Sequence, residues 1–329
     1  MDTITHAIAG GVIAKAFFPK RIKNYAVSAA VIASTFPDFD YVLTFISKEV
    51  YLRYHRGVTH SIFFIIPLAL LLSFLFAHFR DKEFKYYFYL SLVSISVHIF
   101  FDLITSFGTM IFAPFSDARV SFDTVFIVDL IFSGILIASF LAGMFFKKTK
   151  PFIYKTSLIT LAIYIGICSA FHNKALNLAK TFTTNETVSY SALPQPFSFA
   201  RWNLLIEEKN TVKTSFVDFF KKGDKSYKVG LLKSRIPVYS SPYYLIFETF
   251  DKGGKYRLSL NKEKELDFFY WFARYPIAWE ETYTNGEKLI NFFDLRFSSV
   301  RGRYPFLLTY KLDANGRILS KKLFNSVQR

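Results

Sequence analysis

The chain has 329 residues, of which 52% are hydrophobic and 19% aromatic, and it carries a formal net charge of +16. This composition excludes an ordinary soluble protein and is typical of a membrane domain joined to a soluble domain. The only cysteine, Cys168, lies in an apolar run, so a disulfide framework and a cysteine-based metal site are both excluded.

Six apolar segments occupy the first half of the chain, and four of them are long enough to cross a bilayer. The second of the two shorter segments reaches only about 18 Å at ~1.5 Å per residue, against a hydrocarbon core of roughly 30 Å. We therefore expect it to end inside one leaflet or to pack against longer helices. The long segments are residues 61–79, 86–108, 124–146 and 153–171, and the short ones are residues 3–18 and 25–36.

The connections between these segments differ in charge, and cytoplasmic loops collect Lys and Arg. If the helices alternate in direction, the basic connections 19–24, 80–85 and 147–150 share one face, which we predict to be cytoplasmic. No basic segment or cleavage site typical of a removable signal peptide opens the chain. The other face, predicted to be extracytoplasmic, then receives the N-terminus, residues 37–40, 55–60, 98–102 and 115–123, and everything after 172.

The composition changes from about residue 180, where aromatic and β-branched segments alternate with glycine-containing turns. Strands are predicted at 213–220, 243–250, 255–260, 288–297 and 305–312, turns at 251–255, 284–287 and 313–317, and a helix at 262–276 ended by Pro276. The predicted fold is an α-helical polytopic membrane domain, residues 1–175, with about four long spans plus two shorter N-terminal helices. A mostly antiparallel β soluble domain, residues 176–329, follows it.

Most of the positive charge belongs to this second part of the chain. Basic residues outnumber acidic ones by 15 to 10 in residues 1–172 and by 26 to 15 in residues 173–329. The second half has no basic repeat and no nucleic-acid motif, so we interpret its charge as a surface for anionic lipid or polymer. A nucleic-acid partner is not expected.

Four compact groups of histidine and aspartate fall on the predicted extracytoplasmic face. Two of them have a spacing of four residues, which places both members on one face of a helix. A third follows Pro37, where an extended chain would point alternate residues the same way. These groups are Asp2 with His6, His98 with Asp102, and Asp38 with Asp40.

The fourth group is His55 and His60, which are five residues apart. On a continuous helix they would be separated by about 140°, so they share a target only if the chain bends between them. Gly57 permits that bend, and Thr59 is a candidate either to cap the following helix or to orient a ligand.

Imidazole and carboxylate groups without a thiolate are the ligand set of Zn²⁺, Mn²⁺ or Fe²⁺ in hydrolytic sites. Each group also has a structural alternative. Asp2 is compatible with a favourable helix-dipole position, residues 37–40 with a loop, Arg56 with an interfacial anchor, and His98 with a hydrogen bond to a neighbouring helix. For His78, His172 and Asp129 we expect structural roles, and for Asp129 a hydrogen bond to a helix neighbour.

Four motifs of this sequence resemble, in order and spacing, those of the YdjM-like family of membrane-bound metal-dependent hydrolases. The family is also described as LexA-binding, inner-membrane-associated hydrolases. The motifs are MDTITHAIAGG, PDFD, HRGVTHS and HIFFDLITSFGTMIFAPFSD, within residues 1–150. The segments PQPFSFARWN and DLRF are similar to those of extended family members that carry a C-terminal domain.

The resemblance implies an integral inner-membrane protein with metal-dependent hydrolase activity. Its motif residues correspond to His6, Asp38, Asp40, His55, His60, His98 and Asp102 of this chain. A fainter similarity links the pattern to secreted zinc-dependent phospholipase C. The N-terminal tryptophan whose amine binds zinc in those enzymes is missing here.

The leading hypothesis from the sequence is a membrane-bound hydrolase that cleaves a phosphoester of a lipid or lipid-linked substrate by metal-activated water. It predicts two or three divalent ions, with zinc preferred over manganese or iron. The alternative is a non-catalytic membrane protein with a structural metal site, whose basic β domain binds a partner or anionic polymer. A transporter is disfavoured, because no pair of broken helices meets at the membrane midplane. The predicted ligands are His6, Asp38, Asp40, His55, His60, His98 and Asp102, and the predicted catalytic residues are Asp38, Asp40 and Arg56.

Overall fold

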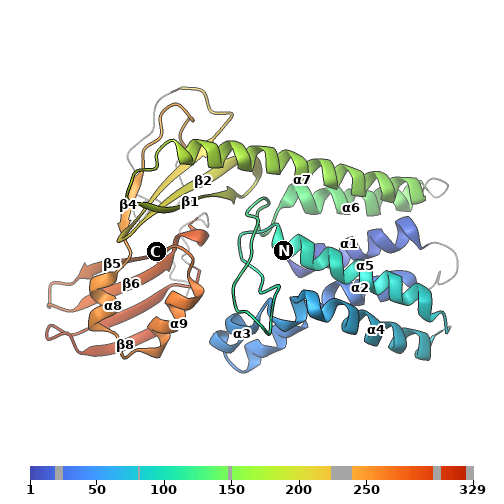
Figure 1. The fold of residues 1–329 in the computed structure, drawn as a ribbon, viewed down its shortest axis with the longest axis horizontal. Coiled ribbons are helices and arrows are strands. Elements are labelled where there is room, and N and C mark those ends of the chain that lie inside the picture. Colours follow the sequence, from blue (N-terminus) through green and yellow to red (C-terminus); the bar gives the residue numbers. More distant parts are fainter. Residues whose placement is uncertain (19–24, 81, 147–149, 224–238, 299–304, 324–329) are drawn as a thin grey trace. The chain divides into compact units, whose positions relative to one another are not determined.

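A computed structural model describes residues 1–18, 25–80, 82–146, 150–223, 239–298 and 305–323. Contacts within the chain define two compact units, Met1–Ala170 and Phe171–Arg329 (Figure 1). The first unit is helical and the second contains all the strands of the described residues. Of the predicted basic connections 19–24, 80–85 and 147–150, residues 19–24, 81 and 147–149 lie outside the described residues.

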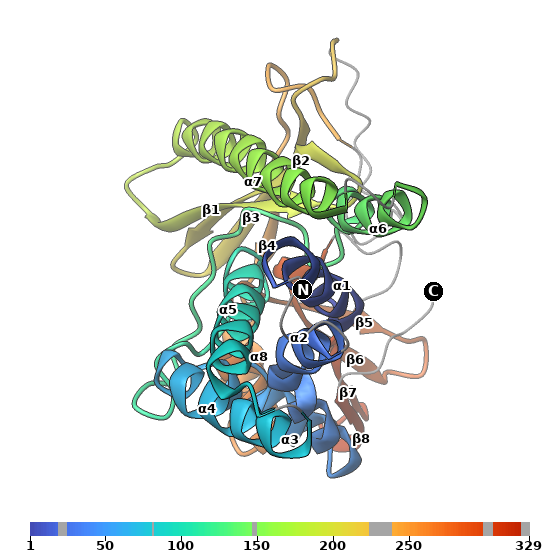
Figure 2. The same ribbon diagram turned by 90° about the vertical axis from the view of Figure 1, so that its right-hand side faces the viewer.

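The helical unit begins with two short helices, α1 and α2, that lie side by side (Figure 2). They approach closely because small residues face each other. A Cβ on Gly10 would lie only 2.6 Å from the Ala30 carbonyl oxygen, so glycine is required there. The bounds are α1 Thr3–Phe17, α2 Ala26–Thr35, η1 Phe36–Phe45, α3 Lys48–Tyr54, η2 Val58–His60, α4 Ile62–Phe79, α5 Phe84–Leu103, α6 Leu130–Phe145 and α7 Lys150–Lys180.

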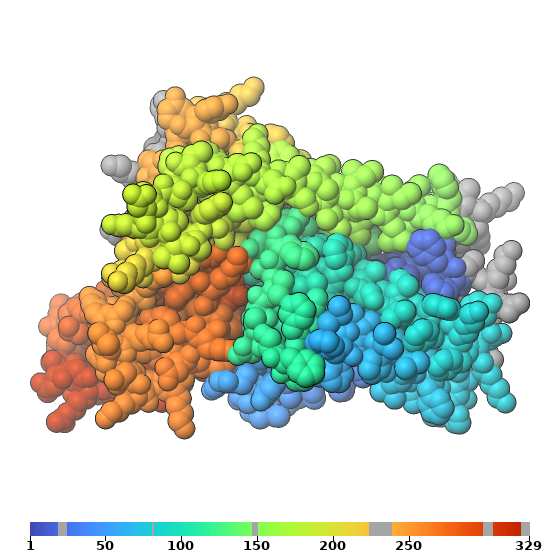
Figure 3. Space-filling view, in the orientation of Figure 1, coloured from blue at the N-terminus to red at the C-terminus, as the bar shows by residue number. Residues whose placement is uncertain are grey.

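Three helices of the described residues are long and apolar enough to cross a membrane, and they are α4, α5 and most of α7. Helix α4 keeps large apolar side chains such as Ile66 and Phe74 exposed, and its outer side lies at the surface of the helical unit (Figure 3). In water such a face would be unfavourable, whereas in a bilayer it meets lipid tails.

The prediction of about four long spans is not confirmed, because the predicted span 124–146 contains only α6, a helix of 16 residues. Its start is fixed by Asp129, whose carboxylate accepts hydrogen bonds from the backbone N–H groups of Ile131 and Phe132. Asp129 also accepts a 2.8 Å hydrogen bond from the Tyr164 hydroxyl of α7, so the predicted bond to a helix neighbour is confirmed.

The second unit contains two four-stranded antiparallel sheets, ordered β1-β2-β3-β4 and β5-β6-β7-β8. Ala175 and Ala179 of α7 pack against Trp202 and Val217 of the first sheet. The strands are β1 Thr187–Gln195, β2 Ser198–Glu208, β3 Thr211–Asp218, β4 Glu248–Asp251, β5 Pro276–Thr282, β6 Lys288–Asp294, β7 Leu308–Leu312 and β8 Ile318–Leu323, with η3 at Leu295–Phe297.

The turns predicted at 284–287 and 313–317 join β5 to β6 and β7 to β8, with Gly286 and Gly316 at positive φ. The strand predicted at 255–260 is wrong, because this segment forms helix α8, Gly254–Ser259. Its buried residues Tyr256 and Leu260 are four positions apart, a helical spacing that the β-rich composition concealed. The predicted helix at 262–276 is α9, Lys264–Phe272, and Pro276 starts β5.

Candidate metal centre

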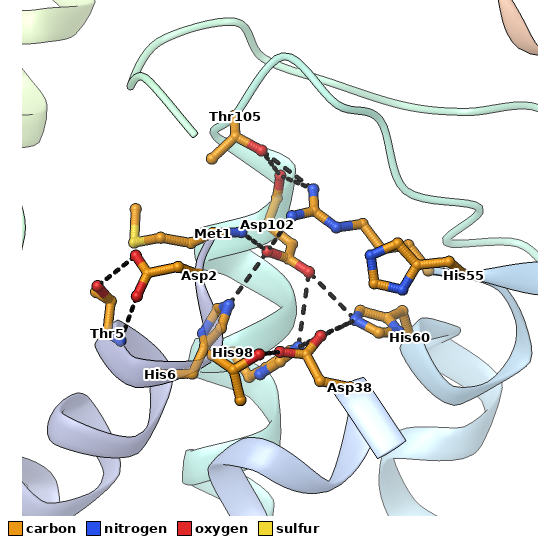
Figure 4. Close-up of polar contacts among 12 residues, drawn as sticks. Met1, Asp2, Thr5, His6, Asp38, His55, His60, His98, Asp102 and Thr105 are labelled. Atoms are coloured by element: carbon orange, nitrogen blue, oxygen red, sulfur yellow. Dashed lines mark hydrogen bonds and ion pairs between the residues drawn. The ribbon is translucent and has the colours of Figure 1, made fainter. Parts of the chain in front are cut away.

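The four histidine and aspartate groups predicted to share one membrane face meet at one end of the helical unit. They come from the start of α1, from η1 after α2, from the turn before α4, and from the last turns of α5. Because these helices alternate in direction, segments far apart in sequence arrive at the same place. Figure 4 shows the side chains of His6, Asp38, His60, His98 and Asp102 directed toward one another.

Four of these side chains, Asp38, His60, His98 and Asp102, form a group that could hold a metal ion. The Nε2 atoms of His60 and His98 are 3.0 Å apart. Asp102 Oδ2 lies 3.2 Å from the first and 3.6 Å from the second, and Asp38 Oδ1 lies 3.6 Å from each. The four ligand atoms therefore surround one point (Figure 4).

Both imidazole rings are oriented through their Nδ1 atoms. His98 Nδ1 lies 2.6 Å from the Ser34 carbonyl oxygen, which can only accept a hydrogen bond, so this nitrogen carries the proton. His60 Nδ1 contacts the Thr59 hydroxyl at 3.0 Å. A partner on Nδ1 is the usual way to turn Nε2 of a neutral ring toward a metal.

The two carboxylate oxygens of Asp102 have different surroundings. Oδ1 accepts hydrogen bonds from the Met1 amino group and from His6 Nε2 at 3.2 Å, and it forms an ion pair with Arg56 Nη2 at 2.9 Å. Oδ2 is buried and has no aligned hydrogen-bond donor among the described residues. A buried carboxylate oxygen without an aligned donor is costly, and a cation between Oδ2 and the two Nε2 atoms would satisfy it.

The charges of Asp38 and His60 follow from this packing. Burial tends to raise the pKa of Asp38, but its contacts with His60 and His98 outweigh that effect and hold the pKa well below its usual value. Burial likewise tends to lower the pKa of His60, but the carboxylates of Asp102 and Asp38 outweigh it and raise the pKa. These directions favour a negatively charged Asp38 beside a positively charged His60.

Asp38 and Asp40 do not point the same way, because residues 36–45 form the 3₁₀ helix η1 and the predicted extended segment is wrong. Pro37 at the start of η1 fits a helical first turn, and there residues two apart diverge around the axis. Asp38 therefore faces His60 and His98. Asp40 Oδ1 instead pairs with His55 Nδ1 at 2.9 Å.

Asp40 also organises the HRGVTH segment. Its Oδ2 accepts hydrogen bonds from the Arg56 backbone N–H at 3.1 Å and from the Thr59 hydroxyl at 3.3 Å. Thr59 thus orients His60, while Ser61 caps α4 by accepting a hydrogen bond from the Phe63 N–H. Of the two roles predicted for Thr59, the structure has the orienting one.

The bend between His55 and His60 occurs at Arg56 and Gly57. Arg56 has φ of +58°, a left-handed conformation that non-glycine residues rarely adopt. A Cβ on Gly57 would lie 2.6 Å from the Tyr54 carbonyl oxygen, so this position requires glycine. The strained turn lets His60 reach the four-residue group, while His55 stays with Asp40.

Arg56 is buried, with 3% of its surface exposed, and its side chain contacts other residues inside the protein. Besides Asp102, its guanidinium contacts the Thr105 hydroxyl at 3.1 Å and lies 4.9 Å from the centre of the Phe107 ring. The side chain therefore neutralises Asp102 inside the protein and does not lie at an interfacial surface.

Histidines 6 and 55 border the four-residue group. The His6 ring stacks on His98 with 3.7 Å between centroids, and its Nδ1 is buried without a partner among the described residues. Burial lowers the pKa of His55, which favours a neutral imidazole. Asp2 is the N-cap of α1 and accepts a hydrogen bond from the Thr5 N–H, so it has the structural role.

Several contributors were missed by the sequence analysis. They are the Met1 amino group, the Ser34 carbonyl and the Thr3 hydroxyl, which donates a 2.8 Å hydrogen bond to Asp38. Backbone groups have no side-chain signature. Thr3, however, lies within the motif MDTITH, so the sequence offered a reason to expect its hydroxyl near the site.

The fold and the cluster define a helical membrane protein with a buried histidine and aspartate group suited to a divalent metal. Residues 1–175 match the family model described as YdjM inner membrane protein. The chain belongs to this family, as its motifs predicted, and it is an integral membrane protein.

The chain is also similar to "Uncharacterized protein YfhP" of Bacillus subtilis (strain 168). The two are 24% identical over 326 residues, which cover 93% of this chain and 90% of that protein. No solved structure matches the chain. The fainter similarity to zinc-dependent phospholipase C is not supported by these comparisons.

Proposed function

We propose that the protein is a membrane-bound metal-dependent hydrolase that cleaves a phosphoester in a lipid or lipid-linked substrate. The observation that carries this proposal is the approach of two imidazole Nε2 atoms and two carboxylates to one buried point, with both rings oriented from behind. The donor set fits zinc, with manganese or iron as alternatives. Asp38, His60, His98 and Asp102 are the ligands of the first ion.

A divalent ion held there would polarise a phosphoryl oxygen and activate water. The chain's own residues divide the remaining work. Arg56 holds Asp102 in place through its ion pair, and Asp40 holds His55 by Nδ1, so that the other ring nitrogen can take up a proton. His6, Asp40 and His55 border the four-residue group and remain the predicted ligands of a second ion.

A lipid substrate is supported by apolar side chains around the cluster. Phe45 of η1 is 88% exposed, and Phe115, in the loop after α5, is 79% exposed. The Phe115 ring packs edge-on against Phe63 in the first turn of the span α4, with 5.1 Å between centroids. Aromatic side chains at the end of a span are typical of the membrane–water interface. A substrate anchored in the bilayer would meet the cluster at this depth, on the face that we predict to be extracytoplasmic.

The test uses the full chain in detergent, loaded with zinc or manganese and incubated with a panel of phospholipids and lipid-linked phosphates. We expect release of a phosphorylated headgroup or of phosphate by the wild-type protein and by His78→Ala, whose side chain is exposed at the end of α4. His98→Ala should be inactive. Absence of release by metal-loaded wild-type protein would overturn the proposal, and release of fatty acid alone would overturn the phosphoester assignment.

A structural metal site is the second candidate function, favoured by the bonds that Asp102 Oδ1 already makes to Met1, Arg56 and His6. Such a network ties helices together whether or not chemistry occurs. The His98→Ala variant separates the two. A variant that no longer folds favours the structural role, whereas a folded variant that lacks activity favours catalysis.

A further inference from the structure

A second site lies in the C-terminal unit, where a cavity of about 650 Å³ opens beside the first sheet. Its walls come from the turn between β2 and β3, the end of β4, helices α8 and α9, and the start of β5. All of these elements belong to one compact unit, so the cavity is formed within that unit. The cavity is lined by five basic residues and only two acidic ones.

The two carboxylates of the cavity already have partners. Glu207 forms an ion pair with Lys252 at 2.6 Å and accepts a hydrogen bond from the Ser189 hydroxyl at 2.7 Å. Asp251 accepts a hydrogen bond from the Gly253 backbone N–H. Among the described residues, neither carboxylate forms an ion pair with Lys209, Lys255 or Arg257, although Asp251 is close enough to Lys255 to interact with it electrostatically.

Three cations of the wall, Lys209, Lys255 and Arg257, form no ion pair with a carboxylate in the part of the chain that the structure describes. Arg257 is held by stacking, because its guanidinium lies 4.5 Å from the centre of the Tyr270 ring. That ring is fixed in turn by the Tyr270 hydroxyl, which donates a 2.7 Å hydrogen bond to the Lys252 carbonyl oxygen. Stacking leaves the N–H groups at the edge of the guanidinium free for an anion.

Several like charges around one cavity repel each other, and an anion that enters the cavity removes the repulsion. An arginine fork together with lysine ammonium groups suits a multiply charged oxyanion better than a single carboxylate. Nucleic acid fits less well, because the Tyr270 face is occupied by Arg257 and cannot stack a base. We propose that this cavity is a binding site for a phosphate group, carried by a lipid headgroup or free in solution.

The test measures binding to the full chain in detergent by calorimetry, with inorganic phosphate and with a water-soluble short-chain phosphatidylglycerol as separate probes. We expect saturable binding that weakens with added salt, and about tenfold weaker binding in the variant Lys255→Gln/Arg257→Gln. Both side chains are exposed, so glutamine should leave the fold intact, as circular dichroism would check.

The matched control is Lys311→Gln/Lys321→Gln, because these lysines of the second sheet already pair with carboxylates, Lys311 with Glu287 and Lys321 with Glu263 and Glu265. It should bind both probes as the wild type does. Tighter binding of the phospholipid than of phosphate would identify a headgroup site, and the reverse would identify a site for free phosphate. Absence of saturable binding, or equal loss in the control, would overturn the proposal. Because the cavity and the metal cluster share no residue, failure here leaves the proposed hydrolase untouched.

Discussion

The helical unit and the C-terminal unit place their charges in opposite ways. The helical unit buries histidines, aspartates and Arg56 at the end of its helices, with their polar atoms at contact distance. The C-terminal unit keeps Lys209, Lys255 and Arg257 at an open cavity. A buried charge requires a partner within the protein, whereas an exposed charge is solvated by water until a ligand binds.

This comparison shows how the charge of a ligand can be inferred from the polar groups that each site leaves without a partner. In the cluster, His6 Nδ1 and Asp102 Oδ2 are buried without a hydrogen-bond partner among the described residues, and both atoms can accept a hydrogen bond or bind a cation. In the cavity, Lys209, Lys255 and Arg257 form no ion pair with a carboxylate of the described residues. The first arrangement favours a metal cation and the second a phosphate anion.

The largest effect is expected from removing a ligand charge without changing its shape. Asp38→Asn should weaken zinc binding by more than about 100-fold, because partners outside the ligand set alone contribute roughly 10–100-fold. Competition with a chelating dye measures the affinity. Asp117→Asn, an exposed residue outside the cluster, is the control and should bind zinc normally. Equal affinities for the two variants would contradict the four-residue site.

The second largest effect is expected from removing the arginine that forms an ion pair with Asp102. Arg56→Met removes one partner of a buried ion pair, and we expect the free energy of unfolding of the metal-free protein to fall by about 3–5 kcal/mol. Arg53→Met removes an exposed pair with Glu49 and should cost about 0–1 kcal/mol. Denaturant unfolding in detergent compares them. A similar loss of unfolding free energy in both variants would show that the buried Arg56 pair stabilises the protein no more than the exposed Arg53 pair does.

A smaller effect is expected where a residue only orients a ligand. Thr59→Val keeps the shape of the side chain but removes the hydroxyl that joins Asp40 to His60. Zinc affinity should fall by about tenfold while the zinc stoichiometry is unchanged. Thr156→Val, which removes a hydroxyl bonded within α7, should leave the affinity as it is. Loss of stoichiometry in Thr59→Val would make this residue more than an orienting group.

The smallest effect concerns the polar contact between α6 and α7. Tyr164→Phe removes the hydrogen bond to Asp129, and interhelical hydrogen bonds in membranes contribute about 0.6 kcal/mol on average. The unfolding free energy should fall by about that amount, with no change in metal binding. Tyr89→Phe, at an exposed position on α5, is the control. A loss of several kcal/mol would show that this contact determines the helix arrangement.

Much of the site could be predicted from the sequence, because spacing and alternation carry the information. His98 and Asp102 are one helical turn apart, and four polar groups fall at alternate helix ends. These two facts predicted the cluster without coordinates. The assignment of partners could not be predicted. It depends on the 3₁₀ turn that separates Asp38 from Asp40 and on the left-handed Arg56, both of which tertiary contacts fix.

The elements of the fold can likewise be divided into those that could be predicted from the sequence and those that could not. Glycine turns in the second sheet were predictable from local chemistry, and so were the span helices α4 and α5. The length of α6 was not, because the apolar run already begins before Asp129, whereas the helix begins only after this N-cap residue. Helix α8 was concealed by residues that also suit strands, and its Tyr256 packs edge-on against Phe292 of the second sheet, a tertiary contact that local propensity does not include.

The central claim is that the four-residue cluster holds a divalent metal. The most direct measurement is elemental mass spectrometry of the full chain purified in detergent, beside the double variant His60→Ala/His98→Ala, with folding monitored by circular dichroism. We predict at least one equivalent of divalent metal, with zinc preferred, in the wild type and none in the folded variant. A well-folded wild type that holds no metal, even after zinc or manganese is added, would contradict the account.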